Sequence, residues 1–204
     1  KVYTKSDSNL YVLNSSGTET KVGAGVTVTS QINVLSSYNP DFELGATTNW
    51  TASGGTFTVT STAANVGAGT YAGSWVTSAS SQTLSSNLTA IPAGLYGQNG
   101  LAQVMLQTSA TDFVLSVTDG TNTLASQTIT GAGASTYAFY QLNFVFPSSG
   151  SVRLVLTSGS ASKTVYIDDA YLGTAVNLTN VSQAQLIGGV VISNCTADFI
   201  TNTA

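Results

Sequence analysis

Apolar and polar side chains alternate along several segments of the chain, with the period of two that is typical of β-strands. Residues 101–108 place small and aliphatic side chains on one face and Gln103, Met105 and Gln107 on the other. Residues 137–146 alternate in the same way, with aromatic and aliphatic side chains on one side. Further short strands are expected at residues 56–60, 71–77, 82–88, 113–118, 122–129 and 152–156.

Turn signals separate these segments, and nothing in the chain has helical character. Asp119-Gly120, between two strand segments, is a strong hairpin signal. No segment carries a sustained helical stripe of apolar residues, and Ser, Thr and Gly are too frequent to favour one. We therefore expect an all-β protein: an antiparallel β-sandwich whose two sheets pack about 10 Å apart.

The clearest strand is residues 164–173 (TVYIDDAYLG), in which two aspartates interrupt β-branched and aromatic residues. Because strand side chains alternate between faces, one of Asp168 and Asp169 should point inward and the other outward. A carboxylate directed at a core is costly unless it is paired, protonated or bound to a metal. Lys163 is the one basic residue nearby in sequence, so a metal ion is a candidate partner.

Residues 39–50 (NPDFELGATTNW) and 164–173 resemble the two ends of a carbohydrate-binding-module-type β jelly roll. In that family an N-x-x-F-E-x-G…W segment pairs near a closing Y-I-D-D-x-x-L strand. Residues 91–97 (IPAGLYG) and 144–154 (FVFPSSGSVRL) resemble segments of jelly-roll domains in phage tail fibres and bacterial surface-fibre adhesins. The resemblance covers residues 39–174 and implies a carbohydrate-binding-like jelly roll in a trimeric fibre protein.

The chain divides into four parts by pattern. Residues 1–25 contain three short strands, a β-meander too small to bury a core, which resembles the stalks of trimeric fibres; a flexible N-terminal arm is the alternative. Residues 26–38 are expected to form a connector or edge strand, and residues 39–174 the jelly roll. In residues 175–204 a polar linker precedes an apolar strand, 186–192, with no evident partner in the chain. That strand is expected either to open a further module or to pair with other subunits. Because both the meander and residues 186–192 carry apolar strands that nothing in the chain evidently covers, we predict a homotrimer.

The composition limits the classes of partner. Only 7% of residues are charged, whereas 42% are hydrophobic, so the surface is expected to consist mostly of hydroxyl and amide groups. Such a surface suits an extracellular, cell-surface or virion-fibre protein that binds neutral polymers such as cell-surface polysaccharides. Three of the five basic residues fall within the first 21 positions, which leaves no electrostatic footprint for nucleic acid. No apolar run approaches the roughly 18 residues of a membrane span, so no membrane insertion is expected.

Little catalytic chemistry is available to this chain. It contains no histidine, which excludes His-based triads and His-ligated zinc, and Cys195 cannot form an intrachain disulfide. That cysteine is expected to be either buried or part of a bridge between subunits. A glycosidase needs two carboxylates about 5–9.5 Å apart. A pair among Asp41, Glu43, Asp168 and Asp169 stays open, but we expect a non-enzymatic protein.

The resemblance implies a structural Ca²⁺ site. Glu43 and Asp168 match the family's calcium positions, where the ion ties the first strand to the last. Calcium takes about 6–8 oxygen ligands, so backbone carbonyls would complete the shell, and Asp41 is an additional candidate. In the alternative, Glu43 and Asp168 cap turns or accept backbone hydrogen bonds without an ion.

Glycan recognition typically combines an aromatic platform, each ring burying about 150–250 Å², with amide and hydroxyl hydrogen bonds. Trp50 follows the opening segment and is expected in the core. The candidates are aromatic residues outside the core patterns and two amides in a Gly-bounded loop; a core or interface role is the alternative for each aromatic. The candidate ligand-binding residues are Tyr71, Trp75, Tyr96, Gln98, Asn99 and Tyr137.

These observations favour a non-enzymatic module that binds glycans or cell envelopes near the tip of a homotrimeric fibre. Two other readings stay open. The chain could be a structural spacer of a fibre with no ligand of its own, or an accessory carbohydrate-binding module of a glycan-active enzyme.

Overall fold

The computed structural model describes residues 32–131 and 133–174 in full, together with the backbone of five short strands outside them. The chain forms two compact units, Gln31–Ala175 and a second unit made of Lys1–Ser30 and Val176–Ala204. Within the described residues, no helix is long and apolar enough to cross a membrane. The two short 3₁₀ turns are η1 (Ala63–Asn65) and η2 (Ala93–Leu95).

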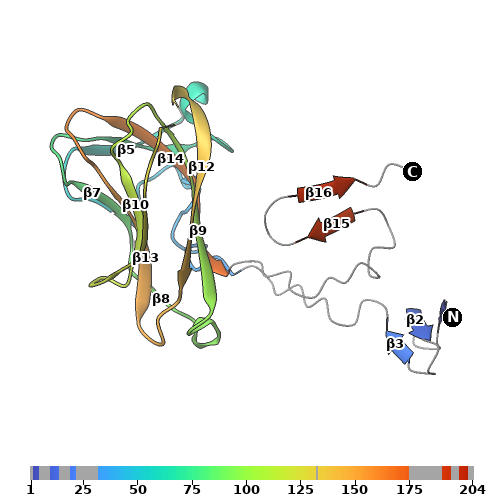
Figure 1. The fold of residues 1–204 in the computed structure, drawn as a ribbon. Coiled ribbons are helices and arrows are strands. Elements are labelled where there is room, and N and C mark those ends of the chain that lie inside the picture. The colour runs from blue at the N-terminus through green and yellow to red at the C-terminus, as the bar shows by residue number, and fades with distance from the viewer. Residues whose placement is uncertain are drawn as a thin grey trace. The chain divides into compact units, whose positions relative to one another are not determined.

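The unit Gln31–Ala175 is a sandwich of two antiparallel sheets (Figure 1). In the first, which we call the front sheet, the spatial order is β12 (Gly133–Val145), β9 (Asn99–Thr108), β14 (Thr164–Thr174), β6 (Ala72–Val76) and β5 (Thr56–Thr60). In the back sheet, the order is β11 (Thr123–Thr128), β10 (Val114–Thr118), β13 (Ser151–Thr157), β7 (Thr83–Ser86) and β4 (Trp50–Ala52), and β8 (Thr89–Ala90) also pairs with β13. The predicted all-β, antiparallel jelly-roll sandwich is confirmed.

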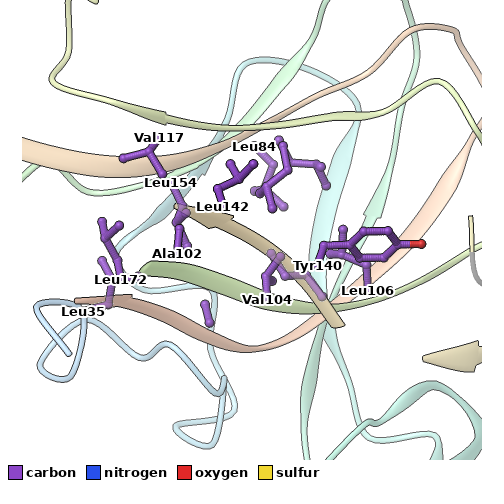
Figure 2. Packing of buried hydrophobic residues seen from close by; sticks show 14 of the residues in the cluster. Leu35, Leu84, Ala102, Val104, Leu106, Val117, Tyr140, Leu142, Leu154 and Leu172 are labelled. Atoms are coloured by element: carbon purple, nitrogen blue, oxygen red, sulfur yellow. The ribbon is translucent and has the colours of Figure 1, made fainter. Parts of the chain in front are cut away.

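The core lies between the sheets and follows the predicted alternation. The apolar side of β9 points inward, toward Leu84 and Leu154 of the back sheet (Figure 2). Trp50 is buried as expected and packs against Phe42, with 5.4 Å between ring centroids. Each large side chain buried in this way contributes about 1.5–3 kcal/mol to folding. The period of two is therefore enforced by the burial of one face of every central strand.

The hairpin between β10 and β11 forms at the predicted turn. The Asp119 carboxylate accepts hydrogen bonds from the N–H groups of Thr121 and Asn122, at 2.8 and 2.6 Å. Gly120 has a φ of +97°, which a residue without Cβ adopts at no steric cost. The Asn122 side-chain amide also donates to Asp119 Oδ2 at 3.0 Å, and this hydrogen bond, followed by the two backbone ones, lowers the pKa of Asp119.

The opening segment lies against the closing strand, as the resemblance implied. The Val34 N–H donates to the Leu172 carbonyl at 2.8 Å, and the Ala170 N–H donates to the Pro40 carbonyl at 2.9 Å. Of the two forms expected for residues 26–38, a connector or an edge strand, the described residues 32–38 have the first: they form turns, with a single β-bridge between Asn33 and Gly173. β6 pairs with β14 only as far as Ile167. Beyond that point, residues 32–41 lie beside β14 in place of β6.

The two aspartates of β14 differ from expectation. A β-bulge shifts the register between Asp168 and Tyr171, and Asp169 within it has a φ of +48°. Asp168 pairs with Met105 on the outer side of the front sheet, and Asp169 is exposed. The expectation that one aspartate points into the core is wrong. Asp168 is buried because a loop covers it from outside.

The second unit contains two small sheets. β1 (Val2–Thr4), β2 (Leu10–Leu13) and β3 (Glu19–Lys21) form the predicted antiparallel meander. β15 (Val190–Ser193) pairs with β16 (Asp198–Thr201). The expectation that the apolar strand lacks a partner in the chain is therefore wrong; the partner is four residues long, too short for its alternation to be read from sequence. Cys195 and most of the linkers, residues 22–31 and 175–189, lie outside the described residues.

Candidate functional site

The outer face of the front sheet carries a row of polar side chains across three strands. Gln103 on β9 is the register partner of Gln141 on β12 and of Tyr171 on β14. The Gln141 side-chain N–H donates to the Gln103 side-chain oxygen at 2.7 Å. This pairing holds both amides against the sheet, and it leaves the Gln103 amide N–H group and the Gln141 oxygen for a ligand.

A hollow of about 350 Å³, which we call the Gln103 pocket, lies on this face. Its volume is within the range of about 300–1,000 Å³ that is common for ligand sites. Its polar lining combines two amides, a phenol and two carboxylates, with residues 32–41 forming one wall. The lining includes Asn33, Pro40, Asp41, Gln103, Asp169 and Tyr171.

The wall of the Gln103 pocket is held by hydrogen bonds of its own. The Asn33 side-chain oxygen accepts the N–H groups of Leu35 and Leu172, at 3.0 and 3.1 Å, and its amide donates to the Ala170 carbonyl at 3.2 Å. The Tyr171 hydroxyl donates to the Thr174 carbonyl at 2.9 Å. The pocket is therefore largely preformed, which lowers the ordering cost of binding.

An aromatic side chain stands beside the amide row. Phe139 on β12 is 57% exposed and pairs with Met105, one row from Gln141 and Gln103. An exposed ring next to fixed amides is the combination that sugar rings bind, because their C–H faces stack on aromatics while their hydroxyls form hydrogen bonds. Phe139 was not among the candidates from sequence.

The loop from residue 61 to 71, between β5 and β6, covers another part of the same face. The Tyr137 hydroxyl donates to the Asn65 carbonyl at 2.9 Å, and the N–H groups of Gly67 and Ala68 both donate to Asp168 Oδ2 at 3.0 Å. A Cβ on Gly67 would lie 2.9 Å from the Met105 methyl group, so the loop backbone packs directly on the sheet. The part of the outer face that a ligand can reach is therefore limited to the area that residues 61–71 leave uncovered.

Burial beneath the loop changes the pKa of two groups. Burial raises the pKa of Asp168 to about 6, against three backbone N–H hydrogen bonds that favour the carboxylate. Burial, and then the charge of Asp168, raise the pKa of Tyr137. Neither group lines the Gln103 pocket.

The two predicted calcium ligands contact the same loop. Glu43 Oε1 accepts the N–H groups of Thr70 and Tyr71 at 2.8 and 2.9 Å, which lowers the pKa of Glu43. Both carboxylates thus face backbone donors, as in the alternative without an ion, and residues 32–131 and 133–174 contain no cluster of three metal-ligating side chains. Calcium at Glu43 and Asp168 stays a prediction.

Trp75 is not part of a binding surface. It is 0% exposed, its indole N–H donates to the Gly54 carbonyl at 2.9 Å, and its ring lies 5.9 Å from that of Phe113. The prediction that it binds ligand is wrong. The strand around Trp75, AGSWV, has too few large apolar residues for the sequence to indicate which face of the strand is buried. The pairing of Trp75 with the buried Val165 shows that Trp75 points inward.

The other sequence candidates lie apart from the Gln103 pocket. Tyr71 packs on Gly45 beside the Glu43 loop, and Tyr137 is half-buried under residues 61–71. Tyr96 is 37% exposed and lies with exposed Gln98 and Asn99 around η2 and the start of β9. Ligand binding by Tyr71, Tyr96, Gln98, Asn99 and Tyr137 stays a prediction.

Sequence reasoning missed Phe139, Gln141 and Tyr171 as site residues. The alternation in residues 101–108 had placed Gln103 on the polar face, and the same rule applied to residues 137–146 puts Phe139 and Gln141 on theirs. The alternation within each strand therefore indicated which of its side chains lie on the polar face. Which polar faces lie side by side depends on the pairing of β12, β9 and β14.

No family model matches the chain, and no curated protein matches it. Among solved structures, the chain is similar to TmCBM61 in complex with β-1,4-galactotriose (24% identity, TM-score 0.55, 71% of this chain and 99% of that one). It is also similar to the enzymatically active domain of bacteriophage CBA120 tailspike protein 4 (18%, 0.54, 71% and 22%) and to arabinose-bound MgGH51 α-L-arabinofuranosidase (12%, 0.52, 72% and 26%). At these identities the similarities establish the fold.

Proposed function

We propose that the sandwich is a non-enzymatic glycan-binding module whose ligand lies in the Gln103 pocket and against Phe139. The observation that carries this proposal is the row of Gln141, Gln103 and Tyr171 with an exposed aromatic beside it. The similarity in fold to a carbohydrate-binding module in complex with galactotriose supports the ligand class.

The charges of the pocket favour a neutral glycan. Asp41 and Asp169 line it, and none of its lining residues is basic. Carboxylates accept hydrogen bonds from sugar hydroxyls but repel acidic sugars. The amides both donate and accept, which suits hydroxyl groups that do the same.

A glycan array followed by titration of the best neutral ligand tests this proposal. Phe139→Ala and Gln103→Ala are each expected to weaken binding about tenfold, or 1.4 kcal/mol. Leu88→Ala is the matched control, because Leu88 is 45% exposed and packs near Gly120 at the hairpin of the back sheet. Equal affinity of all three variants and the wild type would move the site elsewhere, and an empty array would favour the spacer alternative.

The pocket carboxylates also allow a direct test of the non-enzymatic assignment. Asp41 and Asp169 are the residue type that glycosidases use. Incubation of the intact chain with its bound oligosaccharide is expected to release no new reducing ends. Release that Asp41→Asn or Asp169→Asn abolishes would make the module an enzyme.

We further propose that the module is displayed extracellularly, on a cell surface or a virion, as the adhesive part of a homotrimeric fibre. The fibre-like pattern of residues 1–25 and the similarity in fold to a phage tailspike domain support this. Weak binding at each site would then be strengthened about 10²–10⁴-fold by effective concentration. Light scattering should give three times the mass of the 20.8 kDa chain, and a monomer at micromolar concentration would contradict the trimer.

A further inference from the structure

A second hollow, of about 370 Å³, lies where β9, β14 and the start of β12 meet. We call it the Lys163 pocket. Its lining includes Asn65, Gln107, Ala134, Lys163 and Tyr166, and none of the Gln103-pocket residues. Gln107 is four residues along β9 from Gln103, roughly 13 Å at the rise of a strand. The two hollows are therefore separate.

Gln107, one of the residues that line this pocket, carries a buried acceptor without a hydrogen-bond partner among the described residues. Its side chain is 1% exposed, and its amide nitrogen donates to the carbonyls of Ala64 and Ala134 at 3.2 and 2.7 Å. Because both of those partners are acceptors, the orientation of the amide is fixed. Within residues 32–131 and 133–174, the Gln107 Oε1 atom has no hydrogen-bond partner. A hydroxyl donor in the pocket would satisfy it.

Lys163 gives this pocket a charge opposite to that of the first. It is the single charged residue in the lining, whereas Asp41 and Asp169 line the Gln103 pocket. Its backbone is held by Thr77, whose hydroxyl accepts the Lys163 N–H at 3.0 Å and whose N–H donates to the Lys163 carbonyl at 2.9 Å. The backbone of Lys163 is therefore fixed where this residue lines the pocket.

We propose that the Lys163 pocket is a second binding site, for an acidic sugar. A hydroxyl of the sugar donates to Gln107 Oε1 while its carboxylate pairs with the Lys163 ammonium group. The inference rests on the proposed function only in taking a glycan as the ligand class. Together the two sites would select a polymer that contains both neutral and acidic sugars.

Calorimetric titration of the intact chain with trigalacturonic acid and with β-1,4-galactotriose tests this site. Lys163→Gln is expected to weaken binding of the acidic probe at least tenfold and to leave affinity for the neutral probe unchanged. Raising the salt concentration from about 0.1 M to about 1 M should weaken only the acidic probe. Arg153→Gln, which removes the other basic side chain of the sandwich from β13 of the back sheet, is the matched control.

Three outcomes would overturn the second site. These are equal affinity of Lys163→Gln and wild type for trigalacturonic acid, loss of that affinity through Gln103→Ala instead, and a crystal structure with saturating probe that shows only water at Gln107. Loss through Gln103→Ala would leave the proposed function intact, because the acid would then occupy the first pocket. Failure of the proposed function would show separately, as an absence of neutral glycan binding.

Discussion

Two aromatic residues on different strands of the front sheet, Trp75 on β6 and Phe139 on β12, have opposite roles because their side chains point to opposite faces. Trp75 points inward and is fully buried, whereas Phe139 points outward and is 57% exposed. Both residues are aromatic and both lie in strands, so neither residue type nor local composition shows which of them is buried. What separates them is the partner in register, Val165 for Trp75 and Met105 for Phe139.

The first prediction at the residue scale follows from this contrast. Trp75→Ala should lower the free energy of unfolding by about 3–5 kcal/mol, measured by denaturant titration, because it empties a core position. Trp75→Phe keeps most of the volume and should stay folded, with unchanged glycan affinity. A Trp75→Phe variant of near wild-type stability that no longer binds glycans would return Trp75 to the binding site.

The second prediction concerns the pH dependence of stability through Asp168. Its folded pKa of about 6 lies above the ordinary value of 3.8, so the folded state binds more protons between these limits. Without an ion, its contribution to the free energy of unfolding should fall by up to about 3 kcal/mol as pH rises through this window. Comparing wild type with Asp168→Asn in chelator isolates this effect, and parallel pH profiles would contradict it.

The calcium prediction implies the opposite effect on stability: the ionised form of Asp168, rather than the protonated form, would stabilise the folded state. A bound ion would hold Asp168 ionised and stabilise the folded state by about 2.7 kcal/mol at a hundredfold excess over Kd. Chelator should then lower the melting temperature of a calcium-loaded sample, and Asp168→Asn should abolish the response. An unchanged melting temperature would leave the N–H groups of residues 67–71 as the partners of both carboxylates.

At the scale of elements, the pattern predicted the strands and their faces, but it could not predict their pairing. The apolar face of residues 101–108 and the Asp119-Gly120 hairpin are confirmed. Pairing depends on contacts between segments far apart in sequence, such as residues 32–41 beside β14. The Gln103 pocket forms at that junction, so no single segment encodes it.

The junction itself supplies an element-scale prediction. A Cβ on Gly173 would overlap the Ile32 carbonyl oxygen, so Gly173→Ala should displace residues 32–41 and lower the free energy of unfolding by more than about 2 kcal/mol. Glycan affinity should fall with it, because the displaced segment is a wall of the pocket. Gly94→Ala is the matched control, since its Cβ would meet nothing within 4 Å. Equal stability of the two variants in denaturant titration would contradict this account.

At the scale of the whole molecule, the fold does not determine the ligand of the sandwich. A few side chains on the outer face of the front sheet do. The same architecture occurs in a carbohydrate-binding module, a tailspike domain and an arabinofuranosidase, so the fold alone assigns no ligand. The sequence resemblance implied the fold. The candidate ligand-binding residues, chosen as aromatics outside the core patterns and two loop amides, lie in the core, in or under the loop 61–71, or around η2. The pocket that the register builds is the basis of our assignment.

The most direct test of this central claim is a two-dimensional ¹H–¹⁵N spectrum of side-chain amides, recorded with and without the best neutral glycan from the array. The account predicts that the amide resonances of Gln103 and Gln141 shift on binding, while those of Gln82, held by Ser78, and of Gln98 do not. Shifts confined to Gln98 and Asn99, or none at saturating ligand, would contradict it.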